Sequence, residues 1–471
     1  MQRRLAGLRL GGVLLICRTS PRHRTEALEK LVNILNRLRQ SLWLLPGVMS
    51  AGAAGLAWLL LSSGVEDLVT DPGTRWWLFS GDAGTARDLL SSLLSGLITM
   101  TSLVVSITMV VLSLAAGQLG PRLIISFIRD RQIQVVLGLF MGTIVYTLLV
   151  LRSVTDQLGP DAIPHVAVAV ASALTLLCLF ALLFYVHKIA RSIIADTVVR
   201  EVADALENAI AKASPEHRSP PEQDANLGTF STRTPVSIGV AGYVQVIDYG
   251  QLVASAARDD VVIEARIRAG HFVLRGGDHL EILSNGPVPD SLPDDLRKAF
   301  VIGPERTSTQ DLEYSVRQLV EIAVRALSPG INDPFTALAV VNRLGAALES
   351  AAGHIDPPPL HFDDKDALRV RAYTTNFVGL LDASFNQIRQ AATGNAAVLI
   401  QMSDTIGQLA AVVADPARRA GLLAHFRKIE RAAQRSLPDT ADLKDFARSA
   451  DAARKRLAAP GLPEPFEDDG D

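Results

Sequence analysis

Hydrophobic residues are concentrated in four long runs near the N-terminus, whereas the rest of the chain mixes apolar and polar positions. The runs cover residues 42–61, 89–116, 133–151 and 164–186. Each is long enough to cross about 30 Å of hydrocarbon as a helix. Within lipid, a helix satisfies its own backbone polar groups without help from other segments. The pattern therefore predicts a four-helix transmembrane bundle.

Basic residues predict the orientation of these spans. Residues 1–40 and the connection after the second span are rich in arginine, and Lys188 and Arg191 follow the fourth span. The first outer connection instead carries acidic residues such as Glu66 and Asp67. Because basic flanks remain on the cytoplasmic side, we expect both termini to be cytoplasmic. The lipid bilayer is thus the first expected partner.

The second span carries hydroxyl residues along one helical face. At 100° per residue they fall within roughly 80° of one another. They are Ser91, Ser95, Thr99, Ser102, Ser106 and Ser113, defined here as the hydroxyl stripe. One interpretation is a pore wall that replaces part of a solute's hydration. The other is a close-packing seam between helices, which the lack of charged residues in the span favours.

Small residues recur at helical spacing in two other spans. Gly47, Ala51 and Gly55 lie every fourth residue in the first span, and Gly138 and Gly142 form the same spacing in the third. Such residues allow helix backbones to approach closely. We expect them at helix contacts.

The fourth helix is predicted to continue beyond the membrane over residues 188–213, where no glycine or proline interrupts an apolar stripe. This extension would serve as an oligomerising stalk or would pack on a soluble domain. Residues 214–234 contain several prolines and read as a linker.

The remainder predicts a cytoplasmic α+β domain. Short alternating runs over 235–303 indicate a small β barrel or sandwich-like module, with Asp248 capping a short helix. Residues 304–457 are predicted to be helical, beginning with a capping box from Thr307 to Gln310. Residues 353–364 are predicted to form a loop, and residues 458–471 an acidic disordered tail. The further expected helices are 334–352, 366–393, 396–414, 416–436 and 440–457.

Several motifs carry a family resemblance. The run from Arg325 to Ala337, Arg-Ala-Leu-Ser-Pro-Gly-Ile-Asn-Asp-Pro-Phe-Thr-Ala, is the longest, and Glu305-Arg306-Thr307 and Gly242-Tyr243-Val244-Gln245 accompany it. With four spans before a soluble domain, these motifs resemble the predicted bacterial membrane proteins called domain of unknown function 2254. The resemblance implies this architecture and a bacterial inner-membrane location, and it supplies no activity.

The same motifs contain a candidate polar site. Two prolines stiffen the loop between two helices, and an aspartate before the second proline is a typical helix cap. This structural interpretation accounts for most of the loop. The functional alternative is a site where a helix N-terminus and polar side chains meet a small ligand or cation. Its candidate residues are Arg306, Asp311, Ser328, Asn332 and Asp333.

No catalytic constellation is evident. The sequence lacks a Walker-type loop, a nucleophile elbow and a His-Glu-x-x-His helix. The densest potential metal ligands, near the 353–364 loop, lack zinc-site spacing and are interpreted as loop residues. They are His354, Asp356, His361, Asp363 and Asp364. A formal net charge of -3 gives no signal for nucleic acid. We predict no enzyme activity, no cofactor, no metal and no nucleic-acid partner.

Two functional hypotheses remain. The first is a channel-like or transporter-like homo-oligomer gated by its cytoplasmic domain, which the hydroxyl stripe and the long fourth helix motivate. The second is a membrane-tethered scaffold that senses a ligand or recruits a partner through the polar loop around Asn332. The sequence does not decide between them.

Overall fold

The computed structural model describes residues 44–62, 82–118, 130–154, 164–192, 195–213, 230–353, 356 and 359–458. The chain forms two compact units. Unit 1 comprises Met1–Ser113 and Ile124–Ala190, and unit 2 comprises Leu114–Leu123 and Arg191–Asp471. The predicted N-terminal segment, most of the linker and nearly all of the acidic tail lie outside the described residues.

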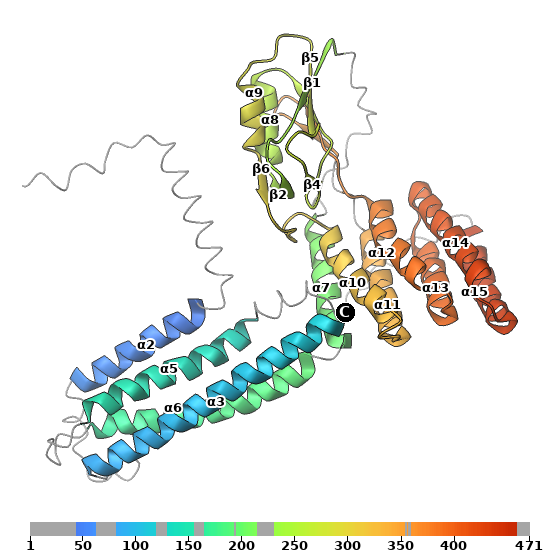
Figure 1. Cartoon of the computed structure of the whole chain (residues 1–471). Helices are drawn as coiled ribbons and strands as arrows, with labels where there is room; N and C mark the ends of the chain where they lie inside the picture. The colour runs from blue at the N-terminus through green and yellow to red at the C-terminus, as the bar shows by residue number, and fades with distance from the viewer. Residues whose placement is uncertain are drawn as a thin grey trace, which may run out of the picture. The chain divides into compact units, whose positions relative to one another are not determined.

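Unit 1 contains the four apolar helices side by side (Figure 1). They are α2 (Leu44–Ser62), α3 (Ala83–Gln118), α5 (Arg131–Ser153) and α6 (His165–Ser192). All four are long and apolar enough to cross a membrane, which confirms the predicted spans. Buried residues from every helix, among them Ala57, Leu90, Tyr146 and Val168, form a shared core.

Helices α2 and α5 pack closely through the two glycines of α5. A Cβ atom at Gly138 would lie 3.1 Å from Cα of Pro46, and one at Gly142 would lie 3.3 Å from the backbone oxygen of Met49. The expected close contact at these two positions is confirmed. By contrast, Gly47 and Gly55 on α2 have no heavy atom within 4 Å of an added Cβ. That part of the α2 stripe does not make the expected contact within the described residues.

Apart from the ends of α3 and α6, the first element of unit 2 is α7 (Ala195–Ala213), and residues 193–194 before it lie outside the described residues. Its apolar side, including Val199, Ala203 and Leu206, is buried in the main core of unit 2 with residues of the later helices. Of the two interpretations of this extension, packing on the soluble domain is the arrangement found.

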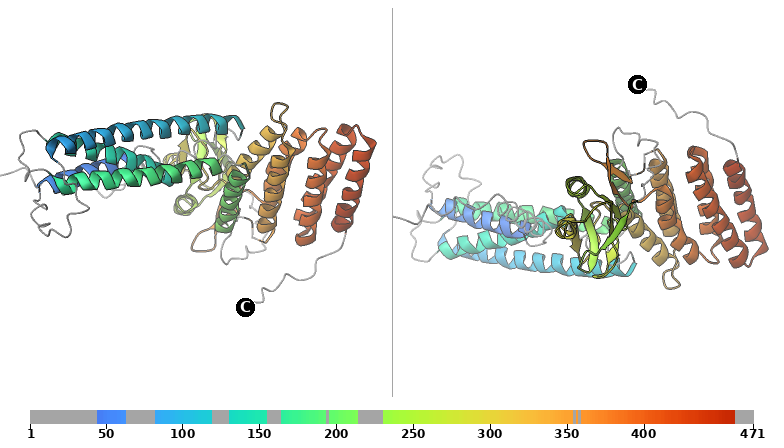
Figure 2. Two further views of the ribbon diagram at one scale, coloured as in Figure 1. Left: turned by 90° about the horizontal axis from the view of Figure 1, so that it is seen from below. Right: turned by 90° about the horizontal axis from the view of Figure 1, so that it is seen from above.

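The later helices of unit 2 form two contacting rows. Helix α10 (Glu313–Ala326) contacts α12 (Phe377–Ala391), which contacts α14 (Pro416–Ser436). In the other row, α11 (Pro334–Ala352) contacts α13 (Ala396–Val412), which contacts α15 (Thr440–Ala458). Figure 2 shows α15 at the end of this stack. Neighbouring helices in sequence also contact one another across the rows, so one apolar core runs through the stack.

The strands form two open sheets. The five-stranded sheet has the order β1-β5-β3-β8-β7, and the three-stranded sheet has the order β4-β2-β6. The predicted barrel or sandwich is therefore not confirmed, although both sheets share a core with α8 (Tyr249–Arg258) and α9 (Leu292–Arg297). The strands are β1 (Thr232–Val236), β2 (Gly242–Ile247), β3 (Val262–Ala265), β4 (Phe272–Val273), β5 (Leu280–Ser284), β6 (Phe300–Gly303), β7 (Leu360–Phe362) and β8 (Leu368–Arg371).

Two strands come from the part of the chain predicted to be loop and helix. Strand β7 lies within the expected 353–364 loop, and β8 occupies the start of the expected 366–393 helix, which begins instead at Phe377. Strand β8 pairs in parallel with β3, with Ile263 opposite Val370. The β module therefore does not end at residue 303, because its central sheet is completed after two helices have intervened.

Candidate functional site

The hydroxyl stripe lies on helix α3 and is called the α3 stripe from here on. It occupies a face of α3 that no other described helix of unit 1 covers. All six of its residues are exposed. The residues that α3 buries are Ala86, Leu90, Leu97, Val104 and Val111, of which the last four recur at every seventh position. At 100° per residue the two sets point roughly 170° apart. Within the described residues, the stripe therefore does not face the packed side of its own bundle.

Hydroxyl groups of the α3 stripe are hydrogen-bonded within the helix. Ser95 Oγ donates to the backbone oxygen of Ser91, and Thr99 Oγ1 donates to that of Ser95, both at 2.9 Å. Each hydroxyl oxygen retains lone pairs after donating its proton. These two positions thus present acceptors to their surroundings without leaving a donor unpaired.

The loop between α10 and α11 is built around a helix cap. Asp333 accepts from the backbone N–H of Phe335 at 3.1 Å and of Thr336 at 3.2 Å, and Pro334 is the first helical residue. Asn332 adopts a left-handed backbone with φ of 49°, a conformation that asparagine tolerates well. Ser328 Oγ donates to the backbone oxygen of Arg325. The polar residues of the loop thus stabilise the conformation of the loop itself.

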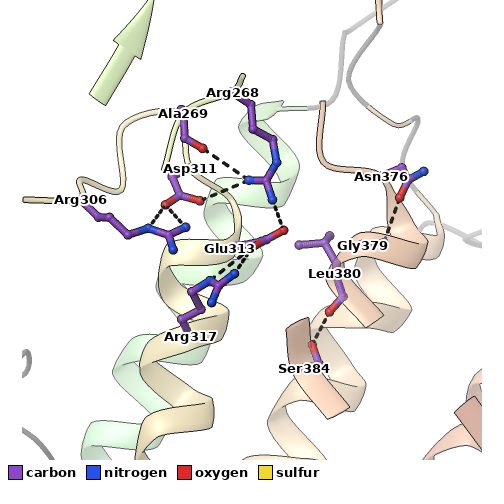
Figure 3. A network of polar contacts seen from close by, with 10 residues as sticks. All are labelled: Arg268, Ala269, Arg306, Asp311, Glu313, Arg317, Asn376, Gly379, Leu380 and Ser384. Atoms are coloured by element: carbon purple, nitrogen blue, oxygen red, sulfur yellow. Dashed lines mark hydrogen bonds and ion pairs between the residues drawn. The ribbon is translucent and has the colours of Figure 1, made fainter. Parts of the chain in front are cut away.

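A network of mostly buried charges lies at the other end of α10 (Figure 3). Asp311, with a side chain only 1% exposed, accepts from Arg306 Nε at 2.8 Å. Arg268, in the turn after β3, pairs with Glu313 in the first turn of α10. Glu313 also pairs with Arg317 at 2.9 Å. We call these five residues the junction network, because they connect the β module to α10.

Gly270 makes room for the junction network. Its backbone has φ of 88°, and an added Cβ would overlap the Asp311 carboxylate and lie 2.5 Å from Arg306 Nη2. The backbone N–H of Gly270 donates to Val244 of β2 at 2.8 Å, which holds the turn against the sheet. Glycine is required here both for the left-handed conformation and for the close approach.

Burial governs the titration of this region. It raises the pKa of Asp311, and the Arg306 guanidinium partly offsets that effect. It also lowers the pKa of His271, next to Gly270, to about 4, with the positive charge of Arg268 acting in the same direction. His271 is therefore neutral near pH 7, and the network carries more positive than negative charge.

The structure separates the five residues predicted to form one polar site. Arg306 and Asp311 meet in the junction network, whereas Ser328, Asn332 and Asp333 follow the C-terminal end of α10. A 14-residue helix lies between the two groups and spans about 20 Å. The hypothesis that all five line one ligand site is therefore wrong.

The sequence did not reveal all of the junction network, and it suggested a wrong role for the nearby Gln310. Glu313 and Arg317 carried a signal, because opposite charges four residues apart meet on a helix. Arg268 carried none, because its partner is 45 residues away. Gln310, expected in a capping box, instead bridges to β2, accepting from the backbone N–H of Ile247 at 2.9 Å and donating to its oxygen. Helix α10 begins after it, with Leu312 as its N-cap.

The potential metal ligands near β7 have separate partners. Asp363 pairs with Arg369 at 2.7 Å, Asp356 pairs with Arg418 at 3.2 Å, and His361 stacks on Tyr249. Among the described residues, which exclude His354, no group of three or more potential ligands converges on one point. The arrangement gives no support to a metal centre there.

The comparisons with known proteins agree with the motifs and the four apolar helices. Residues 39–408 match a family described as predicted membrane protein (DUF2254). The chain belongs to this family. Proteins of Mycobacterium bovis and Mycobacterium tuberculosis, both described only as uncharacterised, are each 29% identical to it over 456 residues. The aligned region covers 93% of this chain and 84% of each relative. No solved structure matches the chain.

Proposed function

We propose that this DUF2254 protein assembles with further copies of itself into a channel-like or transporter-like oligomer, gated by unit 2. The observation that supports this proposal is the exposed α3 stripe, which faces away from the packed side of its own bundle. A second copy offers the same stripe. Several copies around an axis would bring the stripes together, because closed symmetry repeats one surface patch in each subunit.

The chemistry of the stripe favours water or a cation as the species that passes. Ser95 and Thr99 already donate to their own helix, so their oxygens act toward a solute as acceptors. Rings of such oxygens replace part of a cation's hydration shell. The described part of α3 carries no charged side chain within the stripe, so binding would be weak enough to allow release.

The proposed orientation places both termini and unit 2 in the cytoplasm of a bacterial cell, below its inner membrane. The basic flanks support this orientation. Asp130, which caps α5, pairs with Lys188 near the end of α6 at 2.9 Å, so these two helix ends share one side of unit 1. A reporter fused to the last residue should be active only in the cytoplasm. Activity in the periplasm would overturn the orientation.

The decisive experiment compares two adjacent positions of α3 in a background without Cys17 and Cys178. Ser102→Cys places a thiol on the stripe, and Leu103→Cys places one at nearly the same depth on a neighbouring, equally exposed part of the helix. In proteoliposomes, a membrane-impermeant thiol reagent should modify Ser102→Cys and reduce cation or water flux. It should leave Leu103→Cys unmodified, because a thiol in lipid is neither hydrated nor ionised.

Absence of labelling at both positions, together with no flux across varied potential, tension and pH, would reject the proposal. The stripe would then be a packing seam between copies, and the protein a membrane-tethered scaffold. The proposed function assigns no catalysis and no cofactor to the chain.

A further inference from the structure

Helices α7 and α11 of unit 2 pack against each other, and a groove lies between them. Its volume is about 360 Å³, within the range of small-ligand sites. Buried Val199 lies in its lining with Ala339 and Ala346, and polar side chains supply the rest. The polar residues are Asp196 and Arg200 from α7, and Asn342 and Arg343 from α11.

The two arginines are the unusual part of this groove. Most arginines of unit 2 pair with a carboxylate or a backbone oxygen, as Arg306, Arg369 and Arg419 do. The side chains of Arg200 and Arg343 make no hydrogen bond or ion pair with any residue that the structure describes. Asp196 lies one helical turn before Arg200 without pairing with it. Two arginines without a partner among the described residues therefore line one cavity.

We propose that this groove binds a phosphate ester, held by Arg200 and Arg343. A guanidinium group presents a planar fork of donors that matches two phosphate oxygens, and two such groups balance the charge of a phosphate. The Asn342 amide supplies a further donor. Asp196 repels the phosphate but accepts from a hydroxyl or ammonium group attached to it, so the lining matches a phosphate that carries such a substituent.

The covalent chain limits the distance between this groove and the end of α6. Helix α6, an apolar span, ends at Ser192, and Arg200 lies in the second turn of α7. Even if the two residues between the helices are fully extended, adding the helical rise up to Arg200 places Arg200 within about 20 Å of the end of α6. Both a phospholipid headgroup and a soluble phosphate ester are within reach, and both present the same chemistry.

The test uses the full chain and two probes. Native mass spectrometry of protein released from nanodiscs measures retained phosphatidylglycerol, with phosphatidylcholine as the comparison lipid. Isothermal titration with glycerol 3-phosphate measures the soluble source. We expect the Arg200→Gln, Arg343→Gln double variant to weaken binding of at least one probe by at least about tenfold. The control, Arg275→Gln, removes an exposed arginine outside the groove and should bind as the wild type does.

A second variant separates binding from folding. Asp196→Asn removes the negative charge beside the site and should strengthen binding of inorganic phosphate, which has no substituent for Asp196 to accept from. Binding of phosphatidylglycerol alone would assign the lipid source, and binding of glycerol 3-phosphate alone the soluble one. Equal binding by wild type and double variant, or no binding of either probe, would overturn the proposal. These outcomes do not depend on flux through the α3 stripe.

Discussion

The carboxylate of Asp311 occupies the space that a side chain at Gly270 would need. This contact joins the turn after β3 to the residues that precede α10. Because Asp311 is buried and paired with Arg306, it has no alternative position in solvent. The connection between the β module and the helices therefore depends on the absence of one methyl group.

Replacing Gly270 by alanine should lower the free energy of unfolding of the full chain by more than about 2 kcal/mol, because the left-handed backbone and the overlap with Asp311 both add strain. Thermal unfolding in detergent measures the change. Gly276→Ala is the matched control, since nothing lies within 4 Å of its added Cβ, and it should change stability by less than about 0.5 kcal/mol. Equal melting temperatures for the two variants would show that the contact does not hold the turn.

Substitutions at two neighbouring residues of the loop between α10 and α11 should affect the free energy of unfolding differently. Asp333→Ala removes the cap of α11 and should cost about 1 kcal/mol. Asn332→Gly should be neutral or slightly stabilising, because glycine adopts a φ of 49° without a Cβ penalty. Both changes are measured by chemical denaturation. If Asp333→Ala leaves stability unchanged but abolishes stabilisation by an added ligand, the loop has a binding role that its geometry does not reveal.

Because α2 and α5 are in close contact at only some positions, a larger side chain should destabilise the protein at those positions and not at others. Gly142→Leu should destabilise unit 1 by about 1–3 kcal/mol, since an added Cβ would lie only 3.4 Å from Cβ of Ala53. Gly55→Leu on α2 meets open space among the described residues and should leave folding of the single chain unchanged. Resistance to unfolding by a denaturing detergent compares them. Oligomer formation measured on Gly55→Leu would then report whether that face contacts another copy.

His271 predicts a loss of stability on mild acidification. Burial and Arg268 hold its folded pKa at about 4, below the ordinary 6.5. Between these two values the unfolded chain binds a proton that the folded chain does not. The contribution of His271 to the free energy of unfolding is therefore fully present above pH 6.5 and is lost as the pH decreases toward 4. The loss is on the order of 2 kcal/mol, allowing for partial exposure. His271→Gln should flatten the melting-temperature profile over this window, and an unchanged profile would assign the loss to other groups.

The sequence predicted those elements whose signals are local. The four spans depend on long apolar runs, each of which satisfies its own backbone polar groups in lipid by forming a helix. The caps at Asp248 and Asp333 depend on one side chain and the amides two or three residues later, and both are found. The Gly138 and Gly142 contact followed from spacing alone.

Elements that depend on distant partners could not be predicted. Strands β7 and β8 have three and four residues, too few to show a period, and they form because β3 offers an edge. Likewise, Thr307 to Gln310 matches a capping box locally, but Gln310 gains two hydrogen bonds to the backbone of β2 instead. In the candidate site, Asp311 was identified and Arg268 was not, because only the folded turn brings Arg268 near Glu313.

The parallel pairing of β3 with β8 also constrains how the protein is made. Roughly 100 residues separate the two strands, including α10 and α11, so a ribosome completes both helices before the middle of the sheet acquires its last neighbours. At 5–20 residues per second, β3 waits on the order of 5–20 s with one edge open. The unpaired backbone N–H and C=O groups of a strand edge can form hydrogen bonds with another chain. During this time, the open edge of β3 can pair with nascent chains on neighbouring ribosomes of the same mRNA. A premature stop before residue 368 would leave that edge open permanently, so both situations favour aggregation over correct folding.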